Sequence, residues 1–127
     1  MNLEGIDHVA LAVRDVHRSC AWYRDVLGLE RRHEAAWGDM PIMMGVGTTM
    51  VALFPVKGDA KPSPGREVLA MRHLAFRVNA AGFAQAKDEL TRRGIAFEFQ
   101  DHDIAHSIYF DDPDGHRLEI TTYELGG

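Results

Sequence analysis

The segment HVALAVRDV, residues 8–16, recurs in the second half of the chain as HLAFRVNAA, residues 73–81. Both copies begin with the alternation of side chains that is typical of a strand. In each copy the leading histidine shares one face with the second and fourth residues after it. His8 and His73 therefore occupy equivalent positions on two equivalent strands, and we read the chain as an internal repeat.

A helix is predicted after each of these strands. Asp15 is a suitable N-cap for VHRSCAWYRDVL, and Gly28 is placed to end that helix. Asn79 and Gly94 bracket AAGFAQAKDELTRR in the same way. Strand-like segments follow in threes: LERRHEAAW, MPIMMGV and TTMVALFP in the first half, and IAFEFQD, SIYFDD and HRLEITTY in the second.

The order strand, helix, three strands is thus written twice. It predicts an α+β protein built from two βαβββ modules, which we place at about residues 4–55 and 69–124. Residues 56–68, rich in Pro, Gly and Lys, are typical of an exposed linker. We expect both modules to belong to one domain over residues 1–127.

Composition narrows the range of functions. The 127 residues are 46% hydrophobic and 26% charged, as in an ordinary soluble domain, and the net charge of −5 argues against a nucleic-acid partner. No apolar run approaches the roughly 18 residues of a membrane span. The N-terminal MNLEGIDH lacks the regions of a signal peptide, so we expect a cytoplasmic protein without a membrane partner.

One charged residue stands where a charge is costly. In HSIYFDDPDGHRLEITTY, residues 106–123, a tight turn at residues 112–115 joins two alternating runs. Glu119 lies inside the second run, between two apolar residues. A carboxylate buried there needs a partner.

Four segments, taken in order, resemble the vicinal oxygen chelate superfamily, which includes glyoxalase, bleomycin resistance protein and extradiol dioxygenase. They are IDHVALAV, SCAWYRDVLGLE, RHLAFRV and SIYFDDPDGHRLEI, and they cover essentially the whole chain. The resemblance implies modules that curl into a half-barrel whose concave face holds a divalent metal. It also implies a homodimer in which the modules of two chains complete one another's sites, so that His8 can belong to a different subunit from the other ligands.

The resemblance implies that His8, His73 and Glu119 are the metal ligands. The chemistry supports this independently, because two imidazoles and one carboxylate form the facial triad that is usual for non-haem Fe(II) or Mn(II). We favour these two metals, with Zn(II) or Ni(II) as alternatives. A dication would also neutralise the buried carboxylate.

A fourth ligand distinguishes the branches of the superfamily. Glyoxalase I and methylmalonyl-CoA epimerase carry it on the last strand of the first module. The repeat maps Glu119 onto Phe54, and residues 48–56 contain no His, Glu, Gln or Asp. A three-ligand site fits the extradiol dioxygenases and the fosfomycin-resistance enzymes better. The latter use a lysine and further cations, whereas this chain has the acidic FEFQDHD, so we rank them third.

The dioxygenase signature runs from a histidine through Ile/Leu-Tyr and Asp-Pro-x-Gly to the ligand glutamate, and this chain follows that order with Gln100 as a departure. We therefore expect an extradiol-type ring-cleaving dioxygenase acting on a catechol-like molecule. Tyr109 would hydrogen-bond the substrate, and His102 or His106 would move protons. The alternatives are a glyoxalase I-like lyase or isomerase and a non-catalytic small-molecule binding or resistance protein.

The expected partner is a small aromatic or apolar molecule. Apolar side chains are frequent in the strands of both modules, and those that face the metal would line an apolar pocket. The apolar side chains in question are Trp37, Met40, Met43, Met44, Met50, Phe54, Phe97 and Phe99.

Overall fold

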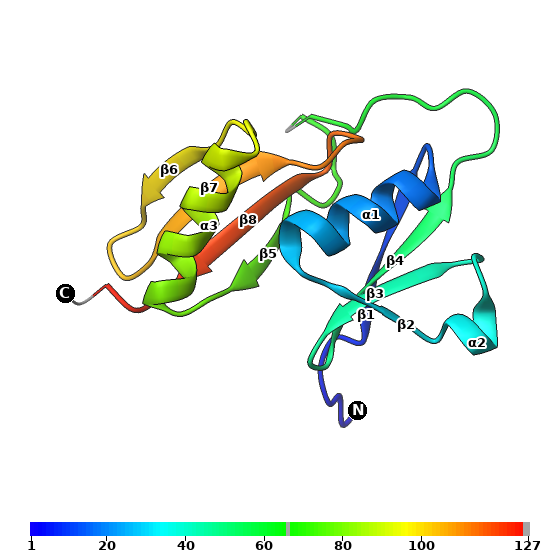
Figure 1. The fold of residues 1–127 in the computed structure, drawn as a ribbon, viewed down its shortest axis with the longest axis horizontal. Coiled ribbons are helices and arrows are strands. Elements are labelled where there is room, and N and C mark those ends of the chain that lie inside the picture. Colours follow the sequence, from blue (N-terminus) through cyan, green and yellow to red (C-terminus); the bar gives the residue numbers. More distant parts are fainter. Residues whose placement is uncertain (66, 126–127) are drawn as a thin grey trace. The chain divides into compact units, whose positions relative to one another are not determined.

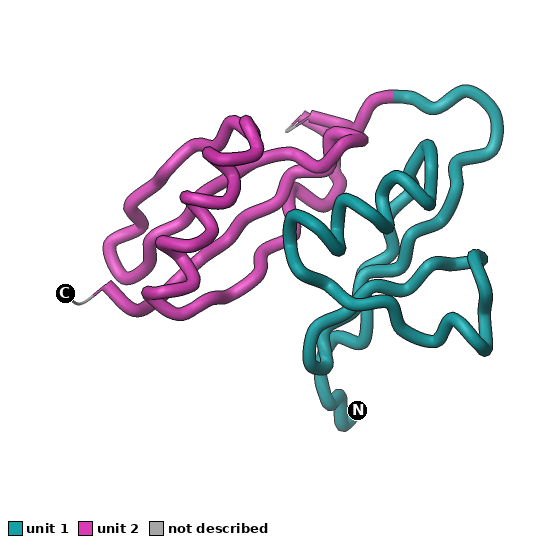
Figure 2. The backbone as a smooth tube through the Cα atoms, in the orientation of Figure 1, with its two compact units in different colours: residues 1–61 teal, residues 62–127 magenta. Residues whose placement is uncertain are grey.

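The computed structural model describes residues 1–65 and 67–125, and the chain forms two compact units, Met1–Lys61 and Pro62–Gly127 (Figure 2). Each unit holds its own four-stranded sheet with a helix of 12 or 13 residues (Figure 1). The predicted α+β class and the doubled βαβββ pattern are confirmed. We call the two bodies unit 1 and unit 2.

Unit 1 begins with the first copy of the repeated strand. Its elements are β1 His8–Val13, α1 Val16–Leu27, β2 Glu30–Arg32, α2 Glu34–Trp37, β3 Ile42–Val46 and β4 Thr49–Pro55. The sheet order is β1-β4-β3-β2, with β1 parallel to β4 and the other pairs antiparallel.

Unit 2 repeats this topology. Its elements are β5 Leu74–Arg77, α3 Ala80–Arg92, β6 Glu98–Asp101, β7 His106–Asp111 and β8 Arg117–Thr122. The sheet order is β5-β8-β7-β6, again with one parallel pair, β5 and β8. The strand β5 begins one residue after His73.

The predicted helix ends are confirmed. The Asp15 carboxylate accepts hydrogen bonds from two backbone N–H groups of α1, and the Asn79 side chain accepts one from α3. Gly28 and Gly94 both adopt left-handed backbone conformations, with φ of 73° and 71°. Each glycine lies where its helix has stopped.

The predicted turn between the last two strands is also confirmed. The Asp112 carboxylate accepts hydrogen bonds of 2.9 Å from the backbone N–H groups of Asp114 and His116. Gly115 has a φ of 86° and donates its N–H to the Asp112 carbonyl at 3.0 Å. This turn sets the register in which β7 and β8 pair.

The prediction of a strand over LERRHEAAW is wrong in its second half. β2 ends at Arg32, His33 has a φ of 57°, and α2 occupies Glu34–Trp37. Two consecutive alanines favour a helix at this point.

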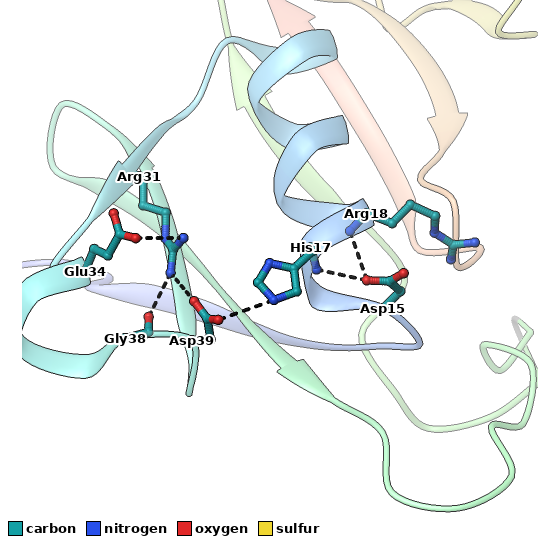
Figure 3. A network of polar contacts seen from close by, with 7 residues as sticks. All are labelled: Asp15, His17, Arg18, Arg31, Glu34, Gly38 and Asp39. Carbon is teal, nitrogen blue, oxygen red and sulfur yellow. Dashed lines mark hydrogen bonds and ion pairs between the residues drawn. The ribbon is translucent and has the colours of Figure 1, made fainter.

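A polar network holds this turn of helix in place (Figure 3). Arg31 donates to the Gly38 carbonyl at 2.8 Å and to the Asp39 carboxylate at 2.7 Å, and it lies 3.2 Å from the Glu34 carboxylate. The other Asp39 oxygen is 3.3 Å from His17 Nε2. The hydrogen bond from Arg31 is the main cause that lowers the pKa of Asp39. The network therefore joins α2 to the start of α1.

The two faces of the unit 2 sheet have different roles. The face toward α3 is apolar and forms the core; its buried strand residues are Ile108, Phe110, Leu118 and Ile120, and the buried residues of α3 are Phe83 and Leu90. Side chains alternate along each strand, so the intervening residues point to the opposite face. That face carries Tyr109 and Glu119, and α3 does not cover it.

Residues 56–65, 67 and 68 form no helix or strand, and most of them are exposed. Arg66, which the predicted linker includes, lies outside the described residues. Within residues 1–65 and 67–125, no helix has both the length and the apolar character that a membrane span requires.

Candidate functional site

Glu119 lies in β8 with only 7% of its surface exposed. Its Oε1 atom is 2.9 Å from Nε2 of His73, and its Oε2 atom accepts a 2.6 Å hydrogen bond from the Ser107 hydroxyl. Both carboxylate oxygens of this buried group therefore have partners. The structure brings together two of the three predicted metal ligands, His73 and Glu119.

Strand register explains why these side chains meet. Glu119 pairs with Ala75 on one side and with Tyr109 on the other. His73 precedes Ala75 by two residues and Ser107 precedes Tyr109 by two, so both project from the same face as Glu119. The repeat that was visible in the sequence thus positions His73 beside the carboxylate.

Tyr109 and His102 form a second pair on this face. The Tyr109 hydroxyl lies 2.9 Å from Nε2 of His102, and the Tyr109 ring packs edge-on against His73 at 5.6 Å. Burial and the nearby Glu119 carboxylate raise the pKa of the Tyr109 phenol. At neutral pH this residue is therefore a protonated hydrogen-bond donor.

The structure separates the two candidate proton carriers. His106 projects toward the α3 side of the sheet, where its ring packs edge-on against Phe99 at 5.2 Å. Its Nε2 atom lies 3.6 Å from the Asp101 carboxylate. His102 contacts Tyr109, whereas His106 faces away from Glu119.

His8, the remaining predicted ligand, begins β1 in unit 1. Its side chain is 45% exposed, and its Nδ1 atom lies 2.8 Å from the Asp7 carboxylate. A carboxylate on Nδ1 is the usual second contact of a metal-binding imidazole and leaves Nε2 for the metal. Within the described part of the chain, no three His, Cys, Asp or Glu residues gather as a metal site. The complete triad stays a prediction.

The donor set in unit 2 fits a divalent cation. An imidazole nitrogen and a buried carboxylate oxygen face one another, and both atom types are ligands of Mn(II), Fe(II) and Zn(II). Ser107 holds the other carboxylate oxygen, as outer-shell partners of metal ligands do.

A cavity opens on the same face of unit 2. Polar side chains form much of its lining, which consists of Pro64, Gly65, Ala70, Met71, Arg72, His73, Gln100, His102, Tyr109, Asp111, Gly115 and Arg117. It differs from the apolar pocket that the sequence led us to expect. Sequence analysis missed Arg72 and Arg117; the one available signal was that Arg117 precedes Glu119 by two residues and so shares its face.

Comparison with known proteins places this site in context. The family model of the Glyoxalase/Bleomycin resistance protein/Dioxygenase superfamily matches residues 5–120. The chain is 31% identical to "Metallothiol transferase FosB" of Staphylococcus epidermidis, covering 97% of this chain and 86% of the relative. It is 27% identical to "Glutathione transferase FosA" of Serratia marcescens, covering 93% and 80%.

A solved structure also matches the fold. The chain is similar to a glyoxylase/bleomycin resistance protein/dioxygenase domain from Frankia sp. EAN1pec, with a TM-score of 0.80 and 25% identity, over 99% of this chain and 96% of that one.

These relatives overturn the leading functional prediction. The expectation of an extradiol dioxygenase is wrong, because the curated relatives are transferases whose names specify a thiol or glutathione. They are enzymes, and the name metallothiol transferase agrees with a divalent metal but gives no preference for iron. The fosfomycin-resistance enzymes were ranked too low because the charge of the site was judged from the acidic segment FEFQDHD alone. In the structure the cavity also receives Arg72 and Arg117 from other segments.

Proposed function

We propose, since this chain belongs to the Glyoxalase/Bleomycin resistance protein/Dioxygenase superfamily, that it is a divalent-metal-dependent enzyme that transfers a thiol to a small electrophile bearing an anionic group. We place this reaction in the cytoplasm, where low-molecular-weight thiols stay reduced.

The observation that carries this proposal is the end-to-end similarity to a metallothiol transferase, 31% identical over 97% of the chain. Fold alone would not specify the reaction, because the superfamily hosts several chemistries. The similarity extends over nearly the whole chain, and this supports a shared site as well as a shared scaffold.

The geometry of unit 2 supports a metal in this role. His73 and Glu119 would hold it, with His8 as the third ligand, and Ser107 would keep the Glu119 carboxylate in place. When bound, a divalent metal supplies Lewis-acid polarisation of an oxygen on the electrophile. We further propose a homodimer in which modules of two chains complete each site, so that the subunit supplying His8 need not supply the other two ligands.

Thiol transfer also needs two proton movements. The thiol loses its proton, its sulfur bonds to the electrophilic carbon, the carbon–oxygen bond breaks, and the released oxygen gains a proton. His102 and Tyr109 both line the cavity, and their polar atoms are 2.9 Å apart. We assign the proton removal to His102 and the donation to Tyr109, whose raised pKa keeps it protonated at neutral pH.

The charges around the cavity support an anionic substrate. Among the described residues, the charged side chains that line it are two arginines, Arg72 and Arg117, and one carboxylate, Asp111. Fosfomycin, an epoxide that carries a phosphonate, is a suitable test compound because it combines the electrophile and the anion.

The experiment measures thiol consumption with fosfomycin as the electrophile and L-cysteine or glutathione as the thiol, with and without Mn(II). We expect consumption that needs both the metal and the electrophile. Glu119→Ala should abolish it, whereas Asp88→Asn, which removes an exposed carboxylate from α3, should retain it. Consumption that is equal in wild type and Glu119→Ala, or independent of metal, would exclude the proposed site.

A further inference from the structure

Arg117 lines the cavity, and its guanidinium already contacts other side chains of the protein. Its Nη2 atom lies 2.7 Å from a carboxylate oxygen of Glu98, and its Nη1 atom lies 3.4 Å from Asp111. Its guanidinium also lies over the Tyr109 ring, 5.6 Å from the centroid. The aromatic ring and two carboxylates therefore hold the guanidinium at the edge of the candidate site.

The strand pairing explains this arrangement. Arg117 of β8 is paired with Asp111 of β7. Glu98 of β6 is paired with Tyr109, which precedes Asp111 by two residues on β7. The Glu98–Arg117 contact is thus a diagonal ion pair that reaches across β7. Glu98 also lines a second cavity, which shares Tyr109, Asp111 and Arg117 with the first.

The two arginines of the site differ in their partners. Within residues 1–65 and 67–125, no carboxylate forms an ion pair with Arg72, which lines the same cavity as Arg117. An anion that entered this cavity would meet Arg72 directly. Arg117 already donates from Nη2 to Glu98 and from Nη1 to Asp111, so an anion that bound the Nη2 atom would compete with Glu98.

Glu98 is the carboxylate that can be replaced at small cost. Its side chain is 68% exposed, and exposed ion pairs contribute little to stability because water screens them. A phosphonate or carboxylate of a ligand can take both N–H groups of a guanidinium at once. Asp111 is the β7 residue paired with Arg117, and its carboxylate lies 3.4 Å from Nη1 of Arg117. This contact would keep Arg117 in position while Glu98 is displaced.

We propose that Arg72 and Arg117 together bind the anionic group of the substrate and that Glu98 is an internal competitor whose displacement from Arg117 sets the affinity. Glu98 is accordingly a specificity-determining residue. The inference rests on the proposed function for the role of the anion in turnover, but anion binding can be measured without turnover.

The test is calorimetric titration of the full chain, supplied with Mn(II), with methylphosphonate at low ionic strength. Methylphosphonate has no electrophilic carbon, so its binding does not depend on thiol transfer. We expect Glu98→Gln to bind it about three- to tenfold more tightly than wild type, and Arg117→Gln or Arg72→Gln to bind it about tenfold more weakly, in line with the energy of hydrogen bonds to charged groups. Thermal unfolding of each variant confirms that it is folded.

Asp88→Asn is the matched control for charge. It removes one negative charge from α3, on the other side of the sheet, and should leave the affinity unchanged. Equal affinities for Glu98→Gln and Asp88→Asn would overturn the competitor role, and an unchanged affinity in Arg117→Gln would overturn the anion site. If the affinities follow the expected order while thiol consumption is absent, the proposed reaction fails and the anion site stands.

Discussion

Glu119 is a buried carboxylate held by two different partners, an imidazole and a hydroxyl. This arrangement suits a metal ligand, because the Ser107 hydrogen bond fixes one oxygen while the other lies beside His73, the second proposed ligand. Sequence reasoning selected His73 from its repeat position and Glu119 as a charge between two apolar residues of a strand. It missed Ser107, which has no exposed surface and which the strand pattern presents as an ordinary small residue.

The Ser107→Ala substitution tests this support. It leaves a buried carboxylate oxygen without its donor, so we expect a loss of roughly 1–3 kcal/mol in the free energy of unfolding. We also expect metal affinity to fall about ten- to a hundredfold, as when outer-shell partners are removed. Urea unfolding and equilibrium dialysis with Mn(II) measure the two effects.

Thr121→Val is the control for that substitution. Thr121 Oγ1 lies 2.9 Å from Ser107 Oγ, but Glu119 takes its hydrogen bond from Ser107. The valine variant should therefore keep its metal affinity. If Ser107→Ala bound metal as tightly as wild type, the orienting role of the hydroxyl would be wrong.

At the scale of elements, the two long helices start with different caps, Asp15 for α1 and Asn79 for α3. Hydrogen bonds from backbone N–H groups, the strongest from Arg18, lower the pKa of Asp15 below its ordinary value of 3.8. A carboxyl group with a lowered pKa in the folded state contributes stability above its unfolded pKa. That contribution is lost as the pH falls through the lowered folded value.

The caps therefore predict a pH-independent effect for one substitution and a pH-dependent effect for the other. Asn79→Ala should lower the free energy of unfolding by about 1 kcal/mol at all pH values. Asp15→Ala should lower the urea midpoint at pH 7, and its deficit relative to wild type should shrink below about pH 4, where Asp carboxylates begin to protonate. Urea midpoints measured from pH 7 to pH 2.5 give both trends. A deficit for Asp15→Ala that did not change with pH would contradict the charged cap.

The elements that the sequence predicted are those with local signals. Caps, left-handed glycines and the Asp112–Gly115 turn each depend on a few adjacent residues. The short helix α2 was missed because its contacts through Arg31 run to Gly38 and Asp39 along the chain, and no strand or helix period encodes them.

At the scale of the whole molecule, the repeat predicted the topology of both units, because a duplicated strand order carries its pairing with it. The cavity in unit 2 could not be predicted in the same way. Its lining comes from the segment before β5, from β6 and β7, and from the start of β8, so its charge depends on which residues converge. For this reason the acidic segment FEFQDHD, taken alone, led to the wrong reaction being predicted.

The chain as a whole is proposed to work as a homodimer with shared metal sites. Sedimentation velocity should give a species of two chains, and two variants that are each inactive, His8→Ala and Glu119→Ala, should regain part of their activity when mixed. Mixing restores one intact site only if the ligands come from different subunits. A dimer that gained no activity on mixing would place His8 and Glu119 in the same chain.

The most direct test of the account is the mass of the product formed from fosfomycin and L-cysteine by the Mn(II)-supplied protein. We predict a single product whose mass is the sum of the two reactants, because a thiol transfer adds the whole thiol and loses no atoms. A product with the mass of fosfomycin plus water, or unchanged fosfomycin at the end of the incubation, would contradict thiol transfer as the function of this chain.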